Sequence, residues 1–434
     1  MQGRRRPRPV HPVVIDLEQL VPRSHRLRRV DSVLDLRFVY SLTKPLYSAR
    51  MGRASIDPVM FFKMEVVKYL YGIKSNRQLC EDIQVNLAFR WFLRLAVDEQ
   101  VPDHSSLSKV RDRLGEDVFR AVFERIVIQC QKAGLVKGNQ MITDATLISA
   151  NAANKSLVER TPKRSRGRPR KVSAVALNDI PVKKKVKKET HFSKTDPDAS
   201  FVSRSGKPAR FYYKSHCTID GAHKVITDCH VTTGSTHECT VLTDRVDYQL
   251  KRFHIKPKEW LADAGYGHGP TYRFFRKRKI TTYIPLRDNK LGKGKFSPTR
   301  GFVYDHKNDV YRCPYGYTLT PHKPSNGFTR YVITGGECKT CPFRSSCLKG
   351  HGKIKSRRVQ RSFYQEEFDR VHRRRTTKQF KGKLRQRAWK IEGTFGEDKS
   401  NHDLGRAQCR GLAKVQSQVY MIAVAHNLKR LAKL

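Results

Sequence analysis

The spacing of apolar residues divides the chain into a helical N-terminal region, a strand-rich middle and a helical C-terminal region. In the N-terminal region, one apolar run begins at Asp57 and Pro58 and stops at Gly72. An Asp before the helix, a Pro in its first turn and a Gly after its last turn are typical helix boundaries. Ser75 with Gln78 three residues later forms a capping-box pattern, which predicts that a second helix begins there.

The pattern changes from helical to strand-like after the N-terminal region. Between 116 and 130 the apolar side chains still lie on one stripe of a helix, which predicts a core helix. Residues 141–148 are then rich in apolar and β-branched residues, which predicts a strand. Two further predicted strands, 211–219 and 224–233, flank an Asp220-Gly221 dipeptide, which predicts an antiparallel hairpin.

The remaining elements complete an α/β pattern. Residues 259–267 are typical of a strand followed by a glycine-containing turn into a helix, and 280–286 of another short strand. From 357 to 434 the pattern is again helical, and its last helix carries Val415 and Val419 at helical spacing.

Composition shifts give the expected domain boundaries. Residues 1–137 form a helical domain with a basic arm, and 138–300 begin the α/β core. Within that core, 155–200 are crowded with Lys, Arg, Ser and Pro, which predicts a disordered basic loop. A cysteine-containing insertion follows at 301–356, and 357–434 return to the core as helices.

Charge is the bulk property that most restricts function. The 434 residues include 88 Lys and Arg against 39 Asp and Glu, a net charge of +49. An excess of this size implies a polyanionic partner, and phosphate neutralisation would supply most of the binding free energy to DNA or RNA. No run approaches eighteen apolar residues and the N-terminus lacks the apolar centre of a signal peptide, so we expect no membrane partner and a cytoplasmic, nucleoid-associated protein.

Three acidic residues are candidates for chemistry because of the segments in which they lie. Asp144 lies in a predicted strand and Asp263 directly follows one, where a carboxylate is costly unless a cation compensates it. Glu392 shares a predicted helix face with Trp389 and Phe395, so it should point the way the buried residues point. Taken singly, each Asp could instead cap a turn or pair with an Arg. A carboxylate set suits Mg²⁺ or Mn²⁺, and two such ions serve phosphoryl transfer.

An ordered set of segments that covers nearly the whole chain resembles the bacterial insertion-sequence transposases with a DDE catalytic core. The central segments are Asp144-Ala145-Thr146, Asp263-Ala264-Gly265-Tyr266-Gly267 and Glu392-Gly393-Thr394-Phe395-Gly396. Further matching segments lie at 47–48, 52–53, 56–59, 69–73, 101–105, 410–415 and 427–431.

The resemblance implies a fold, a site and a reaction. The expected fold is α/β: a ribonuclease H-like mixed-sheet core with an N-terminal all-α DNA-binding domain, to which the cysteine pattern of this sequence adds a small zinc-binding insertion with four cysteine ligands. Asp144, Asp263 and Glu392 become the catalytic ligands of two Mg²⁺ or Mn²⁺ ions. The implied reaction is cleavage of double-stranded DNA at the ends of the insertion sequence, followed by strand transfer into target DNA. Holding two ends together implies a homodimer or a larger assembly.

Two other functions use the same residues. An endonuclease would cut DNA with these carboxylates and never join a 3′ end to a target. A domesticated transposase would bind DNA as a regulator without catalysis. That class usually loses one catalytic acid, and here all three are present.

The family's signature around the Glu is matched only in part. Lys399 lies seven residues after Glu392, where related transposases contact the element end. The signature's tyrosine and arginine are replaced by Arg385 and Ala388, and Arg387 is the candidate substitute for DNA contact. Trp389 could stack on a flipped base, although we expect it to pack in the core. His237, which follows a predicted strand, is interpreted as structural.

Four cysteines form a second constellation. Cys338 and Cys341 make a CxxC pair, Cys347 follows closely, and Cys313 on a predicted turn supplies a fourth thiolate. Four thiolates suit a tetrahedral structural Zn²⁺, so we predict a zinc site, with free thiols as the alternative because the gap from Cys313 is long.

Two basic segments are candidate DNA contacts. The 102–113 segment predicts a turn and a short helix bearing Lys109, Arg111 and Arg113, which could enter a major groove or remain a solvated basic helix. The second segment, 163–171, resembles an AT-hook that lays arginines into a narrow minor groove. The alternative is that it is an unspecific basic linker. Its arginines are Arg166, Arg168 and Arg170.

Overall fold

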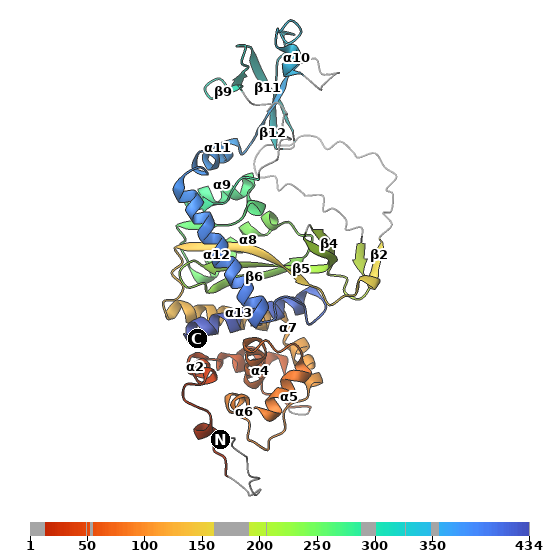
Figure 1. Ribbon diagram of the computed structural model, residues 1–434, viewed down its shortest axis with the longest axis vertical. Coiled ribbons are helices and arrows are strands. Elements are labelled where there is room, and N and C mark those ends of the chain that lie inside the picture. Colours follow the sequence, from red (N-terminus) through yellow and green to blue (C-terminus); the bar gives the residue numbers. More distant parts are fainter. Residues whose placement is uncertain are drawn as a thin grey trace, which may run out of the picture. The chain divides into compact units, whose positions relative to one another are not determined.

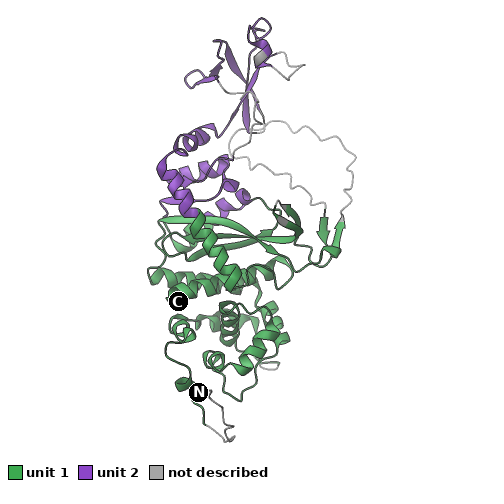
Figure 2. Cartoon of the chain, in the orientation of Figure 1, with its two compact units in different colours: residues 1–237, 247–256, 388–434 green, residues 238–246, 257–387 purple. Residues whose placement is uncertain are grey.

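The computed structural model has two compact units, which are coloured separately in Figure 2. Unit 1 comprises Met1–His237, Asp247–Lys256 and Ala388–Leu434; unit 2 comprises Glu238–Val246 and Pro257–Arg387. The structure describes residues 14–48, 50–52, 55–159, 191–204, 206–287, 301–325, 327–348 and 356–433.

The N-terminal part of unit 1 is helical, as the apolar spacing predicts. Asp57 caps α4 by accepting a hydrogen bond from the Met60 N–H at 2.8 Å, and Ser75 caps α5 through the Gln78 N–H at 3.1 Å. The helices of this region are α1 (Leu17–Leu20), α2 (Arg26–Val33), α3 (Phe38–Thr43), α4 (Pro58–Leu70), α5 (Asn76–Val85), α6 (Leu87–Leu93) and α7 (His104–Lys132), with a 3₁₀ turn η1 (Lys44–Leu46).

The long helix α7 contains a break at Gly115. This residue has φ 66° and ψ 175°, a conformation that glycine adopts without the steric cost of a side chain. The break separates the basic 104–114 segment from the apolar stripe predicted for 116–130, whose Phe119, Phe123 and Ile126 are fully buried.

The strands of unit 1 form an antiparallel array around the long strand β5. β1 (Gln140–Ser149) pairs with β5 (Lys207–Asp220), and β6 (Ile226–Thr233) pairs with the C-terminal half of β5, which confirms the predicted hairpin. The N-terminal half of β5 pairs with β4 (Ser200–Arg204).

The prediction that 155–200 form a disordered loop is wrong at both ends of that segment. Its two ends are ordered: after the 3₁₀ turn η2 (Asn154–Ser156), β2 (Leu157–Glu159) pairs with β3 (His191–Ser193), and β3 pairs with β4. Apolar side chains at these ends, such as Leu157 and Phe192, support short strands that the basic composition concealed.

Two helices complete unit 1. α13 (Leu412–Leu431) packs against α4, α7 and β6, and all its residues from Val415 to Leu428 are buried. The C-terminal half of α12 (Lys378–Asn401) crosses a face of the sheet (Figure 1). There, Phe395 and Asp398 line a small internal space with Cys217 and Cys229.

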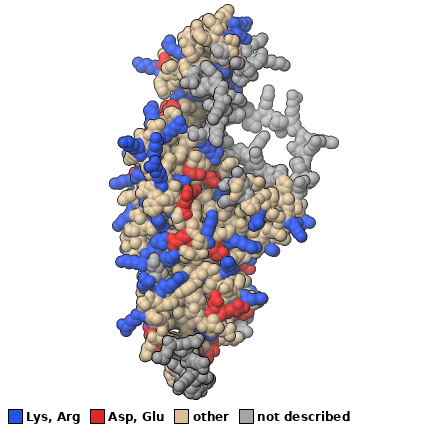
Figure 3. Space-filling view, viewed as in Figure 1, with Lys and Arg blue, Asp and Glu red and all other residues tan. Residues whose placement is uncertain are grey.

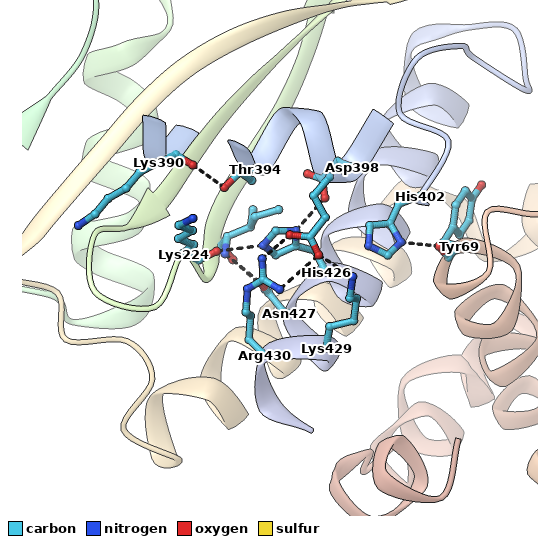
Figure 4. Close-up of polar contacts among 12 residues, drawn as sticks. Tyr69, Lys224, Lys390, Thr394, Asp398, His402, His426, Asn427, Lys429 and Arg430 are labelled. Carbon is cyan, nitrogen blue, oxygen red and sulfur yellow. Dashed lines mark hydrogen bonds and ion pairs between the residues drawn. The ribbon is translucent and has the colours of Figure 1, made fainter. Parts of the chain in front are cut away.

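A buried polar network fixes α12 to its neighbours (Figure 4). Asp398 lies 2.7 Å from His426 Nδ1 on α13, and His426 Nε2 lies 3.0 Å from the carbonyl oxygen of Lys224 at the β5–β6 turn. About two helical turns before Asp398 on α12, the Lys390 ammonium donates to the carbonyl oxygen of Gly221. The orientation of α12 about its own axis is therefore set by hydrogen bonds as well as by packing.

Unit 2 contains a parallel strand pair and a small antiparallel sheet. β7 (Glu259–Leu261) pairs in parallel with β8 (Thr281–Tyr283), and α9 (Gly269–Lys277) connects them. The small sheet consists of β9 (Val303–Asp305), β10 (Val310–Arg312), β11 (Thr318–Ser325), β12 (Phe328–Val332) and β13 (Arg358–Ser362). The other elements are η3 (Glu238–Thr240), η4 (Ala264–Tyr266), α10 (Arg344–Cys347) and α11 (Gln365–Arg374). The helix α8 (Leu242–Phe253) contributes residues to both units.

The purely helical character predicted for 357–434 is wrong at its start. β13 pairs with β12 in the small sheet, and its Val359 is buried in the apolar cluster of Tyr311, Leu319 and Tyr331. None of the helices in the described ranges has the length and apolar character needed to cross a membrane.

Candidate active site

Asp263 occupies the turn that directly follows strand β7. Its carboxylate accepts a hydrogen bond from the Gly265 N–H at 2.8 Å and thereby caps η4. The guanidinium of Arg287 donates to the carbonyl oxygen of Gly265 at 2.9 Å, which holds the same turn from the other side. The Asp side chain therefore has a fixed position at the end of a buried strand.

A second carboxylate, that of Glu238 in η3, borders the same turn. A Cβ added to Gly265 would lie 2.2 Å from Glu238 Oε2 and 2.9 Å from Asp263 Oδ1, so both carboxylates approach the space that the missing side chain leaves. A side chain at position 265 would therefore displace one or both carboxylates. No sequence motif predicts Glu238, which directly follows His237. The one sequence signal for Glu238 is its place after a predicted strand.

The surroundings of Asp263 disfavour its ionised form. Burial raises the pKa of this carboxyl above its usual range, the negative charge of Glu238 raises it further, and the positive charge of Arg387 opposes both effects. Two carboxylates in a partly buried position are a favourable setting for a cation, because a cation would offset both burial and repulsion.

Asp144 lies in the middle of β1, opposite Cys217 of β5. Its Oδ1 accepts a hydrogen bond from the Ala145 N–H at 2.8 Å, and its side chain is half-buried. Directly paired residues of an antiparallel ladder point to the same face of a sheet. Because Cys217 faces Phe395 and Asp398 of α12, Asp144 lies on the sheet face that α12 crosses.

Glu392 and Trp389 are exposed on α12, which corrects the predicted burial of this face. Trp389 is 57% exposed, whereas Phe395 is 8% exposed. The ring of Trp389 lies beneath the ammonium of Lys224, with Nζ 4.7 Å from the ring centroid. The expectation that Trp389 packs in the core is therefore wrong, and its indole is accessible for stacking.

The three predicted catalytic acids are divided between the two units. Asp144 and Glu392 belong to unit 1, where the first is on the sheet face that α12 crosses and the second is on α12 itself. Asp263 belongs to unit 2 together with Glu238 and Arg387.

The four predicted zinc ligands share one pocket in the cysteine-containing part of unit 2. Cys313, Cys338, Cys341 and Cys347 all line a cavity of about 250 Å³. Burial raises the pKa of the Cys347 thiol, with Arg357 opposing it and the other three cysteines adding to the increase. Among the described residues, however, no group of three or more His, Cys, Asp or Glu side chains is arranged to hold a metal ion.

The predicted DNA contacts differ in their exposure. Lys109 and Arg113 are exposed on α7, and Lys399 is exposed on α12. The prediction that Arg111 contacts DNA is wrong. Its side chain is 8% exposed and its Nη2 lies 2.5 Å from Glu65 Oε1, so it does not belong to the exposed face of the helix. Arg387 is half-buried.

The AT-hook residues Arg166, Arg168 and Arg170 lie outside the described residues. On the described surface, Lys and Arg side chains are spread over both units on the face seen in Figure 3, whereas Asp and Glu gather in a few places.

Two family models match parts of the chain, and both describe transposase domains. Residues 15–113 match the family described as a transposase domain (DUF772), and residues 312–432 match the transposase DDE domain. No curated protein sequence matches the chain.

Among solved structures, a piggyBac transposase synaptic complex with hairpin DNA is 12% identical, with a TM-score of 0.37, over 94% of this chain and 74% of that one. A pre-cleavage Mos1 transpososome is 12% identical, with a TM-score of 0.18, over 54% of this chain and 62% of that one. A Mos1 mariner paired-end complex with Mn gives 12% identity and a TM-score of 0.17 over 54% and 61% of the two chains. With a transposase domain at its N-terminal end and a DDE domain at its C-terminal end, the chain belongs to the DDE transposases and is a DNA transposase.

Proposed function

We propose that Asp144, Asp263 and Glu392 form the catalytic triad of this transposase, on a ribonuclease H-like core. The observation that carries the proposal is the position of Asp263, a fixed and partly buried carboxylate beside Glu238 at the end of a strand. In the triad, Asp144 comes from the centre of β1 and Glu392 from the exposed side of α12.

The donor set fits a hard divalent cation. Asp144, Asp263 and Glu392 would hold Mg²⁺ or Mn²⁺, two ions in the active complex, which would activate the attacking oxygen and stabilise the leaving one. Repulsion between Asp263 and Glu238 supports this assignment, since it is relieved when a cation binds.

The protein's own contribution is to hold these carboxylates in place. The β1–β5 ladder fixes the backbone of Asp144, and the N–H of Gly265 orients the carboxylate of Asp263. The Asp398–His426 contact and the Lys390–Gly221 hydrogen bond hold the α12 segment that presents Glu392. Such preorganisation favours catalysis because little rearrangement is required during the reaction.

The proposed reaction has two chemical steps on DNA. Water attacks a phosphodiester at the element end, a P–O bond forms, and the O3′ leaves as a free 3′-hydroxyl. That hydroxyl then attacks a phosphodiester of the target, and the target's own 3′ oxygen leaves. The number of phosphodiester bonds is conserved in the second step, so no external energy source is needed.

The partners follow from this reaction. Double-stranded DNA would contact Lys109, Arg113, Lys399 and Arg387, and the basic segment with Arg166, Arg168 and Arg170 would add phosphate contacts. Arg111 would support the α7 segment through Glu65. We propose that a homodimer or larger assembly holds the two ends, and that the protein works in the cytoplasm on the nucleoid.

We further propose a structural Zn²⁺ on the thiolates that share the unit 2 pocket. The proposal is supported by the chemistry of four sulfur donors, which fits Zn²⁺, and by their common position around one cavity. Metal analysis of the purified protein tests this, comparing the native chain with Cys341→Ser. Loss of one zinc per chain in the variant is expected, and equal metal content would leave these residues as free thiols.

A strand-transfer assay tests the triad. Labelled element ends, a plasmid target and Mg²⁺ or Mn²⁺ are combined with the native chain or with Glu392→Gln. We expect joined product from the native chain and a decrease of more than about 100-fold in the variant, since even residues that only support metal ligands cost up to about that factor. Cleavage without joining would favour the endonuclease, and tight binding without cleavage would favour the regulator.

A further inference from the structure

A basic pocket of about 500 Å³ lies within unit 1, away from the proposed triad. Its walls come from the α4–α5 connection, the start of α7, and the segment between α12 and α13. The charged side chains in the lining that bear on its chemistry are Lys68, Lys74, Arg77, Arg111, Arg406 and Asp403. Five of these six are cations, so the pocket favours an anion.

Lys68 is the most informative of these residues. It is 1% exposed, and its Nζ donates one hydrogen bond, to Asn76 Oδ1 at 2.6 Å. An ammonium group has three donors, and within the described part of the chain Lys68 forms no ion pair. Burial lowers the pKa of Lys68 to about 8, although the negative charges of Glu65 and Asp403 partly oppose this effect. Because Lys68 forms no direct ion pair with a described residue, an anion in the pocket would stabilise its buried charge.

The other basic residues divide into one that is already paired and three that are not. Arg111 is neutralised by Glu65. Lys74, Arg77 and Arg406 are exposed and make no ion pair with any residue that the structure describes. Asp403, the acidic residue in the lining, accepts a hydrogen bond from Gln408 Nε2 at 2.8 Å. The positive charge of the pocket is thus largely uncompensated.

Backbone geometry adds to the preference for an anion. α5 begins at the pocket, where Ser75 caps the helix and Asn76 and Arg77 form its first turn. The N-terminus of a helix attracts negative charge because its first N–H groups and its dipole point outward.

The pocket also joins two distant parts of the sequence. His402 Nδ1 lies 2.6 Å from the carbonyl oxygen of Tyr69, and Gln408 Nε2 donates to the carbonyl oxygen of Ile73 at 3.4 Å. These contacts fix the α12–α13 segment against the helical N-terminal region. A ligand here would therefore be held by the DUF772 domain and by the DDE domain at once.

We propose that this pocket binds a backbone phosphate of DNA and anchors the DNA where the helical region meets the α12–α13 segment. Lys68 and the first turn of α5 form the floor of the site, and Lys74, Arg77 and Arg406 approach the phosphate oxygens from its rim. The proposal rests on the chain acting on DNA. It assigns an anchoring role to residues outside the triad and outside the predicted recognition segment of α7.

Salt-dependent DNA binding by the full chain tests the proposal. The Arg77→Ala, Arg406→Ala double variant changes two exposed side chains and is compared with the native chain and with Lys132→Ala, Lys137→Ala. The two control lysines are exposed in the same unit and do not line the pocket. We expect the pocket variant to bind about tenfold more weakly or worse, as loss of a charged hydrogen bond predicts. Its plot of log affinity against log salt concentration should be shallower by about one unit for the lost phosphate contact.

The remaining outcomes distinguish failure of this site from failure of the function. DNA binding by the native chain with equal affinity and slope in the pocket and control variants would overturn the phosphate site and leave the transposase function intact. No DNA binding by the native chain would overturn both. If inorganic phosphate at matched ionic strength protects the native chain from heat but the pocket variant binds DNA normally, the pocket binds a free anion and the DNA proposal is wrong. Lys68→Met, with its folding checked by circular dichroism, should weaken DNA binding as the rim variant does.

Discussion

One face of the C-terminal half of α12 is buried and hydrogen bonded, whereas the opposite side carries Trp389 and Glu392 in solvent. The buried face contains Lys390, Thr394 and Asp398, each with a hydrogen-bond partner. On the exposed side, the described contacts of the Trp389 ring are with the ammonium groups of Lys224 and Lys390, whose Nζ atoms lie 4.7 Å and 5.6 Å from the ring centroid. The comparison indicates that one side of the helix fixes its position and the other side presents its chemistry. Substitutions on the two sides should therefore affect different measurements.

The largest expected effect on stability is that of Asp398→Ala. The change removes the carboxylate that lies 2.7 Å from His426 Nδ1 and leaves a fully buried imidazole without this partner. We expect a loss of about 3 kcal/mol in the free energy of unfolding, measured by urea denaturation.

Glu392→Gln is the matched control on the same helix. Glu392 is exposed, so its replacement should change the free energy of unfolding by less than about 0.5 kcal/mol while abolishing strand transfer. Equal destabilisation by the two variants would contradict the division of α12 into a structural and a chemical side.

The burial of α12 shows where sequence patterns stop being informative. Trp389, Glu392 and Phe395 are three residues apart, which suggests a single face. Each step of three residues falls about 60° short of a full turn, so the outer two differ by about 120° around the helix. Phe395 is on the buried side of that arc and Trp389 is on the exposed side. The limits of the buried arc depend on what α12 packs against, which the sequence does not specify locally.

Local signals were the best predictors of this fold. The Asp57 and Ser75 caps and the Asp220-Gly221 hairpin depend on neighbouring residues only, and each is present as predicted. Buried polar contacts such as Asp398–His426 join residues 28 positions apart and could not be predicted from a hydrophobic pattern. The candidate site follows the same rule: a local motif predicts Asp263, whereas no motif marks Glu238, whose approach to Asp263 is seen only in the folded structure.

A smaller effect, on activity, is expected for Trp389→Ala. If the exposed indole stacks on a base near the cleavage point, its loss should cost about 2 kcal/mol of DNA binding or transition-state stabilisation, roughly a 30-fold decrease in cleavage. Stability should fall by less than about 1 kcal/mol, since the side chain contributes mainly a cation–π contact with Lys224.

Trp389→Phe, which keeps an aromatic face, should recover most of the cleavage activity in the same assay. If Trp389→Ala instead strongly lowers the free energy of unfolding, the indole stabilises the fold and belongs to the structural side of the helix.

The smallest expected effect is the pH dependence contributed by Glu397, at the edge between the two sides of α12. Burial opposes its ionisation, but hydrogen bonds from Arg430 and Lys429 of α13 outweigh burial and lower the pKa of Glu397 to about 2. Because the folded pKa lies below the ordinary value of 4.5, this carboxylate stabilises the fold above about pH 4.5, and the contribution is lost as pH falls toward 2. In Glu397→Gln, the free energy of unfolding should be lower by about 1 kcal/mol at neutral pH, a value reduced for partial solvent screening. The difference between variant and native protein should shrink as the medium is acidified through that window. A difference that stayed constant with pH would mean that Glu397 acts through packing rather than charge. The hydrogen-bonded side of α12 would then include Asp398 but not Glu397.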